Sequence, residues 1–320
     1  MFGKMPCSGK NNMAVDNVSF SITNRCNSHC SICNIWKEKC FSDEMSVCDI
    51  EKLFSNPCFS DVNTVSITGG EPFLRKDINE IIVTLKSVLN KLDRIFLNTN
   101  ATIIDKVVNT SVLCSSLFKE TIVSISVDGP KDVHNSLRGI SCYDNAVVLL
   151  NKLQEIPNVK TSVSMTLSKN NANYSALDYV YNLANSYGAM FSFRLADTSP
   201  TYYKNTEKHF SISDEQKSAV SQFIGDKCID NSFLQVLKEF IDTGNVNLIT
   251  ENGRNKCLAG KNFIFMHPNG DMAPCLYSTN KLSVEQLNSG NYHELGKHEP
   301  CPCCTDCAIY PILEHIQKVR

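Results

Sequence analysis

Residues 26–33 read Cys-Asn-Ser-His-Cys-Ser-Ile-Cys and place three cysteines, Cys26, Cys30 and Cys33, at C-x3-C-x2-C spacing. Three thiolates this close can ligate one iron–sulfur cube, and a [4Fe-4S] cluster with three protein ligands leaves one iron open. An open iron accepts a small molecule, so the run predicts a metal site where chemistry begins. A zinc site and disulfide pairing are the alternatives. Zinc sites usually repeat a C-x2-C pair, however, and disulfides need an oxidising compartment.

Composition and charge restrict the cellular compartment and the kinds of partner that we expect. The segment Met1 to Val15 carries Lys4 and Lys10 and lacks the apolar run of a signal peptide. Sixteen cysteines without an export signal indicate a reducing cytoplasm. A net charge of -2 provides no basic field, so long nucleic acid is not an expected partner. Charged residues interrupt the longest apolar stretches, so we expect no membrane span.

Short apolar runs alternate with helical patterns along residues 18–200. Strands are expected at about Val18–Ile22, Val62–Ile67, Arg94–Leu97, Thr121–Val127, Lys160–Leu167 and Met190–Leu195. Helices are expected at about Ser46–Phe54, Ile78–Leu89, Tyr143–Gln154 and Tyr174–Tyr187. Six strand–helix repeats predict an α/β fold, a partial parallel barrel whose chemistry lies at the carboxyl ends of its strands.

Polar and glycine-rich motifs follow these strands. They are Thr68-Gly69-Gly70-Glu71-Pro72, then Asn98-Thr99-Asn100, then Ser124 to Gly129, then His134 and Arg138-Gly139. Paired glycines at a strand end leave backbone groups bare, so a ligand or another segment can approach closely.

With these motifs in this order, the chain resembles the radical S-adenosylmethionine (SAM) enzymes, over roughly residues 18–200. The resemblance implies a partial (β/α)6 TIM-like barrel with the cluster on the loop after the first strand. It also implies that SAM chelates the open iron and is cleaved to a 5′-deoxyadenosyl radical that takes hydrogen from a substrate. A one-electron reductant such as flavodoxin or ferredoxin is then a partner.

By the same resemblance, the SAM-binding residues are Gly69, Gly70, Glu71, Asn100, Ser126, Asp128 and Arg138. Gly69, Gly70 and Glu71 would meet the SAM amino group, and Ser126 and Arg138 its carboxylate and ribose end. A guanidinium suits a carboxylate because its fork binds both oxygens. Structural roles are the alternatives: Glu71 and Asp128 could orient loops, Ser126 could cap a strand and Arg138 could form an ion pair.

A second group of cysteines begins at Cys257 and Cys275 and ends in Cys301, Cys303, Cys304 and Cys307. A zinc ribbon is one interpretation. Beside the first motif, the group resembles the SPASM and twitch extensions, which carry auxiliary [4Fe-4S] clusters. Six cysteines after residue 250 suit one cluster better than two. The expected ligands are Cys257, Cys275, Cys304 and Cys307, although Cys301 with Cys304 is also a C-x2-C pair.

Four segments are therefore expected: an N-terminal extension (1–17), the barrel (18–200), a helical linker (201–250) and an auxiliary iron–sulfur domain (251–320). A hairpin in the last segment, with its turn at His267-Pro268-Asn269-Gly270, would bring Cys257 and Cys275 together.

The motif set resembles enzymes that oxidise, cross-link or epimerise ribosomally made peptides, and also twitch enzymes that oxidise or epimerise aminocyclitols or sugars. Few residues precede the first strand, so a leader-peptide-binding domain, if used, is expected as a separate protein. A non-catalytic iron–sulfur electron carrier is the third alternative. Cys228, outside both cysteine groups, is a candidate hydrogen donor for an epimerase, the alternative being a buried cysteine that serves as a small hydrophobe.

Overall fold

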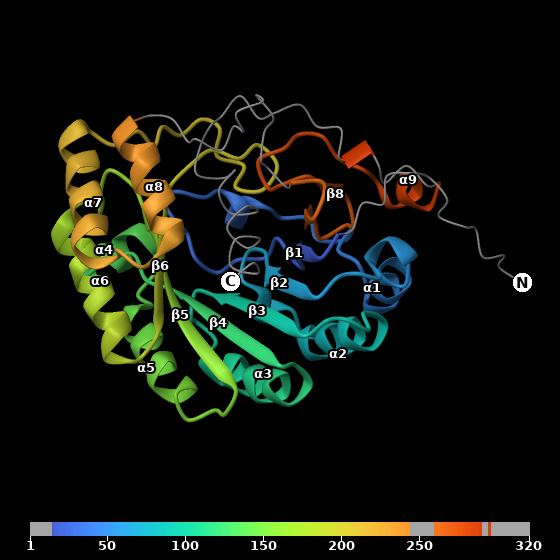
Figure 1. The fold of residues 1–320 in the computed structure, drawn as a ribbon. Helices are drawn as coiled ribbons and strands as arrows, with labels where there is room; N and C mark the ends of the chain where they lie inside the picture. Colours follow the sequence, from blue (N-terminus) through green and yellow to red (C-terminus); the bar gives the residue numbers. More distant parts are fainter. Residues whose placement is uncertain (1–14, 244–258, 290–293, 296–320) are drawn as a thin grey trace, which may run out of the picture.

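The computed structural model describes residues 15–243, 259–289 and 294–295 (Figure 1). Its central feature is one sheet of eight strands in the order β6-β5-β4-β3-β2-β1-β7-β8. Neighbouring strands from β6 to β7 pair in parallel, and β8 pairs antiparallel with β7. The strands are β1 (Asn17–Ser21), β2 (Thr64–Thr68), β3 (Arg94–Thr99), β4 (Glu120–Ser126), β5 (Val159–Leu167), β6 (Met190–Leu195), β7 (Phe263–Met266) and β8 (Met272–Ala273).

Helices connect the successive parallel strands from β1 to β7, as parallel pairing requires, and a further helix follows β8. They are α1 (Val47–Phe54), α2 (Ile78–Val88), α3 (Ile104–Leu117), α4 (Lys131–Arg138), α5 (Tyr143–Leu153), α6 (Tyr174–Ser186), α7 (Asp214–Lys227), α8 (Ser232–Thr243) and α9 (Val284–Asn288). Short 3-10 turns lie at Ile35–Lys37, Pro57–Phe59 and Pro72–Leu74. Several helices begin at a side-chain cap; Ser46, for example, accepts from the Asp49 amide in a capping box.

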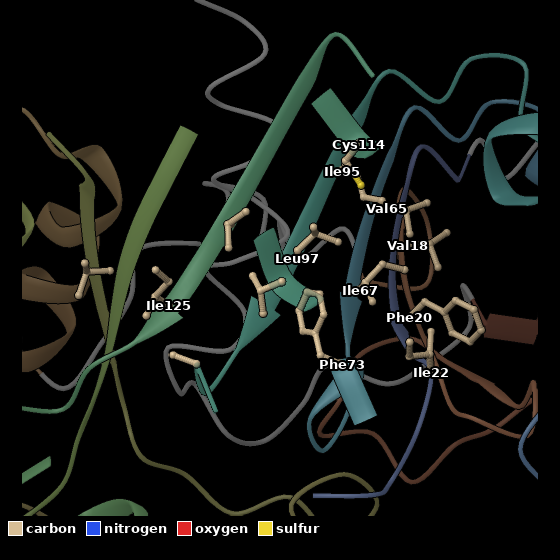
Figure 2. Packing of buried hydrophobic residues seen from close by; sticks show 14 of the residues in the cluster. Val18, Phe20, Ile22, Val65, Ile67, Phe73, Ile95, Leu97, Cys114 and Ile125 are labelled. Carbon is tan, nitrogen blue, oxygen red and sulfur yellow. The ribbon is translucent and has the colours of Figure 1, made fainter. Parts of the chain in front are cut away.

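The outer face of the sheet is apolar and packs against these helices. Phe20 of β1 meets Phe54 of α1 at a ring-centroid distance of 5.6 Å. Figure 2 shows Val65, Ile67, Ile95 and Leu97 in the same layer, with the Phe73 ring among them and Cys114 of α3 nearby. Because side chains alternate across a strand, the residues between these positions lie on the opposite, inner face.

The sequence predictions for the barrel are confirmed. All six expected strands are present, each bound within two residues of its expected position, and the four expected helices are present to within one residue. Helices α3 and α4 had no counterpart among the predictions. The fold is the α/β arrangement expected, a curved parallel sheet with α2, α3, α5 and α6 along one side (Figure 1).

The segment 201–250, expected as a helical linker, is helical where it is described. Its described part forms α7 and α8, whose Val220, Phe223 and Leu234 are buried in the same core as the barrel. The predicted hairpin with its turn at residues 267–270 is present as β7 and β8, but β7 extends the barrel sheet beside β1. Residues 251–258, 290–293 and 296–320, which include Cys257, Cys301, Cys303, Cys304 and Cys307, lie outside the described residues, so the domain boundaries stay a prediction.

Candidate functional site

The three cysteines lie on the loop after β1, residues 22–34, here called the cysteine loop. On one side it contacts the motif after β2. The Gly70 amide donates to the Thr23 carbonyl at 2.8 Å, and the Glu71 amide donates to the Arg25 carbonyl at 2.7 Å. Because these bonds join backbone to backbone, they fix the path of the loop without depending on its side chains.

This contact explains the paired glycines. A Cβ at Gly70 would lie 2.1 Å from the Arg25 carbonyl oxygen and 2.9 Å from Cys26 Cβ. At Gly69, where φ is +146°, a Cβ would lie 2.3 Å from the Thr23 oxygen. Only glycine allows the two segments to approach this closely.

The end of α4 holds the cysteine loop on a second side. The amides of His29 and Ser31 donate to the carbonyls of Arg138 and Leu137, at 2.9 and 2.8 Å. These carbonyls belong to the last turn of the helix, where carbonyl groups lack intrahelical partners. The loop therefore takes the place of a C-terminal cap.

A third contact comes from the segment between β6 and α7, residues 196–213, here called the strap. The fully buried Asn205 donates through Nδ2 to the Ile32 carbonyl at 2.7 Å, and its Oδ1 accepts from the Ser199 amide. The Asn34 amide donates to the Tyr203 carbonyl, and Lys208 Nζ donates to the Ser31 carbonyl. Sequence reasoning missed the strap because these partners are about 170 residues apart.

Tyr202 of the strap also contacts residues 68–72, the Thr-Gly-Gly-Glu-Pro segment here called the glycine motif. Its hydroxyl donates to the Gly69 carbonyl at 2.8 Å and lies 3.0 Å from Thr68 Oγ1, which therefore donates to it. Tyr202 packs with Ile35 and Phe265 in a small cluster that Cys26 and Cys33 also contact. Strap, glycine motif and cysteine loop thus form one packed unit.

The thiols of this loop are partly buried and close enough to influence each other. Burial raises the pKa of Cys26 to about 12, and the neighbouring Cys30 and Cys33 add to the rise. Burial raises the pKa of Cys33 to about 11 and also raises that of Cys30. Such thiols stay protonated until a cation compensates their charge, as iron does on ligation.

The donor set fits a cluster in kind and in spacing along the chain. Within the described residues, no three His, Cys, Asp or Glu side chains converge on a single ion. A cube differs from a single ion because each cysteine ligates a different iron, so its ligands need not meet at one point.

Glu71 is enclosed by hydrogen bonds. Its Oε1 accepts from Thr99 Oγ1 and the Phe73 amide, and its Oε2 accepts from the Asn100 amide at 2.7 Å. Burial raises the pKa of Glu71 to about 7 despite these bonds. The carboxylate therefore ties the end of β3 to the glycine motif.

Asn100 extends this network to the cysteine loop. Its Nδ2 donates to Asn27 Oδ1 at 2.9 Å and to Ser28 Oγ at 2.8 Å, while its Oδ1 accepts from Thr102. Both Asn27 and Ser28 lie between Cys26 and Cys30. In this structure, Asn100 positions the loop that carries the thiols.

Asp128 and Arg138 form a buried ion pair, 2.6 Å between Asp128 Oδ2 and Arg138 Nε. Burial disfavours the guanidinium cation and is the largest single effect, but Asp128 together with Cys30 and Cys142 outweighs it, and the pKa of Arg138 is raised. Arg138 also lies within hydrogen-bonding reach of Cys30, whose pKa its charge lowers against the larger effect of burial. Arg138 therefore stands between Asp128 and one of the three thiols.

His134 binds the backbone of Asp128 beside this ion pair. Its Nδ1 accepts from the Asp128 amide at 3.0 Å, so in the neutral ring Nε2 carries the proton and donates to Cys142 Sγ at 3.2 Å. Burial lowers the pKa of His134 to about 4, which keeps the ring neutral.

Ser126 ends β4 on the inner face of the sheet, and the strands beside it continue the pattern. Ser126 pairs in register with Ser164, and Ser124 with Ser162, while Ser192 of β6 lies opposite Ser164. These five serines are here called the serine wall. Sequence reasoning missed it, although serine alternates with apolar residues in Ile-Val-Ser-Ile-Ser and Thr-Ser-Val-Ser-Met.

Cys228 lies apart from this site, and its expected role as hydrogen donor stays a prediction that its position does not favour. It caps the end of α7 and lines a cavity together with Ala189 and Met190, at the amino end of β6. The motifs lie at the carboxyl ends of the strands, and β6 alone spans about 20 Å at 3.3 Å per residue. A hydrogen donor must contact its substrate radical. Cys228 is a buried residue of the core.

Cys275 is the one expected auxiliary ligand among the described residues. It is partly buried and follows β8, and the carbonyl of the next residue, Leu276, accepts from Ser199 and Thr201 of the strap. Leu276 also packs against the Tyr202 cluster. The strap therefore contacts both the cysteine loop and the neighbour of Cys275.

The described residues contain no helix long and apolar enough to cross a bilayer.

Residues 20–174 match the radical SAM superfamily. The sporulation killing factor maturation protein SkfB of Bacillus subtilis (strain 168) is 29% identical over 56% of this chain and 42% of its own length. The chain thus spans less than half of that relative.

A GTP 3',8-cyclase of Clostridium botulinum (strain Okra / Type B1) is 25% identical over 90% of this chain and 89% of its own length. Among solved structures, Streptococcus suis SuiB bound to precursor peptide SuiA superposes with a TM-score of 0.65. It is 16% identical, with coverage of 93% of this chain and 71% of SuiB, so it supports the fold.

Proposed function

The chain belongs to the radical SAM superfamily, with relatives that support its SPASM/twitch-type subgroup, and on that premise we propose that it modifies a peptide or protein by hydrogen abstraction. A [4Fe-4S] cluster and SAM, when bound, supply one-electron cleavage of SAM to a 5′-deoxyadenosyl radical. Cys26, Cys30 and Cys33 would ligate that cluster. The main support for this proposal is that the glycine motif, the end of α4 and the strap all hold the loop that bears these three thiols.

The residues of the chain would position SAM and the cysteine loop, and they supply a positive charge beside Cys30. In this proposal, the backbone of Gly69 and Gly70 would bind the SAM amino group, and Ser126 would bind its carboxylate. The three other residues would position these groups instead of binding SAM themselves. Glu71 accepts from the Asn100 amide, Asn100 donates to Ser28 of the cysteine loop, and Asp128 accepts from Arg138. The Arg138 cation beside Cys30 stabilises a thiolate there, which favours ligation.

Two observations support a peptide or protein substrate. One relative is named as a maturation protein, and one structural neighbour was solved with a precursor peptide. Oxidation, cross-linking and epimerisation all begin with the same hydrogen abstraction. A small-molecule substrate is the second candidate, favoured by the nearly full-length similarity to a GTP cyclase.

An auxiliary [4Fe-4S] cluster on Cys257, Cys275, Cys304 and Cys307 belongs to the same proposal. The contact of the strap with Leu276 supports it, since it holds the neighbour of Cys275 against the packed unit around the cysteine loop. A one-electron reductant of the flavodoxin or ferredoxin type would drive turnover. A separate leader-peptide-binding protein would present the substrate.

Anaerobic reconstitution with iron and sulfide, followed by SAM and dithionite, tests the cleavage step. We expect 5′-deoxyadenosine from the wild type and none from the variant with Cys26, Cys30 and Cys33 changed to alanine. A variant with Cys40, Cys48 and Cys58 changed to alanine is the matched control and should retain product formation. Equal product from all three proteins would overturn the proposal.

A further inference from the structure

The first residues of the cysteine loop, 22–25, here called the loop entry, are held by a carboxylate that belongs to none of the sequence motifs. Glu44 lies in the segment that precedes α1, and its side chain is only 7% exposed. Its Oε1 accepts from Thr23 Oγ1 at 2.6 Å and from the Asn24 amide at 3.1 Å. Glu44 therefore bonds to both a side chain and the backbone just before Cys26.

The Thr23 hydroxyl extends this contact along the backbone. A hydroxyl has one hydrogen to donate and two lone pairs that accept. Because Thr23 Oγ1 donates to Glu44, its lone pairs are left to accept, and they accept from the Arg25 amide at 3.0 Å. The carbonyls of Thr23 and Arg25 accept from the amides of the glycine motif. The loop entry is thus held by the glycine motif and by Glu44 at the same two residues.

Arg75 and the β7–β8 turn hold the backbone beside Glu44. The Arg75 side chain is 8% exposed and donates to the Ile22 carbonyl and to the Met45 carbonyl, both at 3.0 Å. Met45 follows Glu44, and its amide donates to the Pro268 carbonyl at 2.8 Å. Glu44 therefore contacts the loop entry from a backbone that is itself held on two sides.

The cations near Glu44 have a second anion available. Arg25 Nε and Arg75 Nη1 lie 3.6 and 3.9 Å from Glu44 Oε2. Arg75 also donates from Nε and Nη2 to the two oxygens of Asp77, at 2.8 and 2.7 Å. Because Arg75 keeps Asp77, a neutral side chain at position 44 does not leave a buried cation without a partner. The hydrogen bonds of Glu44 can therefore be tested apart from its charge.

We propose that Glu44 is a positioning residue for the SAM-binding cluster and acts, through the Thr23 hydroxyl, on the backbone that leads into Cys26. This inference rests on the proposed function, in which Cys26, Cys30 and Cys33 ligate that cluster. Partners behind a metal ligand fix its orientation and raise the affinity for the metal. Glu44 does so for Cys26 by holding the two residues that precede it.

Three variants test the inference. Glu44→Ala removes the acceptor, Glu44→Gln keeps an acceptor oxygen without the charge, and Thr23→Val removes the hydroxyl with little change of shape. Glu120→Ala is the matched control. Glu120 also pairs with two cations, Arg94 and Lys160, but at the amino ends of the strands.

Two readouts are used. Hydrogen exchange of residues 22–26 is followed in the apo protein. After anaerobic reconstitution, iron in the cysteine loop is taken as the amount above that of the variant with Cys26, Cys30 and Cys33 changed to alanine. Electron paramagnetic resonance of the reduced cluster is recorded on the same samples.

We expect Glu44→Ala and Thr23→Val to raise exchange in the loop entry about tenfold, because each removes an acceptor of a backbone amide. Both should hold less iron in the cysteine loop and show an altered resonance from its cluster. Glu44→Gln and Glu120→Ala should match the wild type in all three respects. Should Glu44→Ala not fold, the contrast between Thr23→Val and Glu44→Gln still decides.

Wild-type exchange and iron content in either Glu44→Ala or Thr23→Val would overturn the inference. Equal losses in Glu120→Ala would also overturn it, since the effect would then be one of general stability. Equal losses in Glu44→Gln would assign the effect to charge and overturn it too. None of these readouts requires SAM cleavage. A wild type that loads the cysteine loop with iron but forms no 5′-deoxyadenosine would contradict the proposed function alone.

Discussion

Asp128 Oδ2 lies 2.6 Å from Arg138 Nε, with side-chain exposures of only 3% and 12%. The pair joins the end of β4 to the end of α4, and Arg138 in turn faces Cys30. Two motifs separated along the sequence thus form one electrostatic unit that acts on Cys30, one of the three thiols of the cysteine loop.

We predict that Asp128→Asn lowers the unfolding free energy of the apo protein by about 3 kcal/mol, because it leaves a buried guanidinium without its partner. Asp144→Asn, which breaks the exposed pair with Lys131, should leave the unfolding free energy close to that of the wild type. Urea denaturation of both variants checks the difference. Equal losses would contradict this prediction, because the buried Asp128–Arg138 pair would then contribute no more stability than the exposed Asp144–Lys131 pair.

Gly70→Ala should displace the cysteine loop, since its Cβ would collide with the Arg25 carbonyl at 2.1 Å. We expect a loss of about 1–3 kcal/mol in stability and a lower iron content after reconstitution. Gly225→Ala, where the nearest atom is 3.7 Å away on a flexible lysine, is the matched control and should bind iron normally. Full iron loading of the Gly70 variant would contradict this account of the motif.

Asn205→Ala should loosen the cysteine loop from the strap side. The change removes the donor to the partly buried Ile32 carbonyl and the donor to the Asp197 carbonyl, at a cost of about 1–3 kcal/mol. Hydrogen exchange should rise in residues 26–34. Asn182→Ala, which loses only a surface bond to Asp178, should leave that segment unchanged. Protection equal to wild type in the Asn205 variant would show that the strap does not hold the loop.

Burial lowers the pKa of His134 to about 4 and that of His267 to about 3, both below the unfolded value near 6.5. As the pH falls below about 6.5, the unfolded chain binds protons that the folded chain refuses, so stability falls. Each histidine contributes up to about 1.4 kcal/mol per pH unit down to its folded pKa. His267→Gln should remove one such contribution, measured as a shallower loss of unfolding free energy between pH 6.5 and pH 4. An unchanged slope would mean that His267 titrates normally in the fold.

The barrel could be predicted because its strands are apolar on one face and its motifs fall at strand ends. Helix α3 was missed because Ser, Thr, Asn and Val weaken its helical pattern, and α4 because it is short and polar. The strap contacts of Asn205 and Tyr202 join residues far apart in sequence, which no local pattern reveals. The sequence could not show that Cys228 lies at the amino end of β6, because a cysteine outside the motifs does not reveal at which end of the barrel it lies.

The open iron is the central claim, and electron paramagnetic resonance of the reduced, reconstituted protein tests it most directly. To isolate the cysteine-loop cluster, spectra are compared between the wild type and the Cys26, Cys30, Cys33 alanine variant, each with and without SAM. We predict a signal present only in the wild type that SAM shifts. A cysteine-loop signal that SAM leaves unmoved would contradict the account.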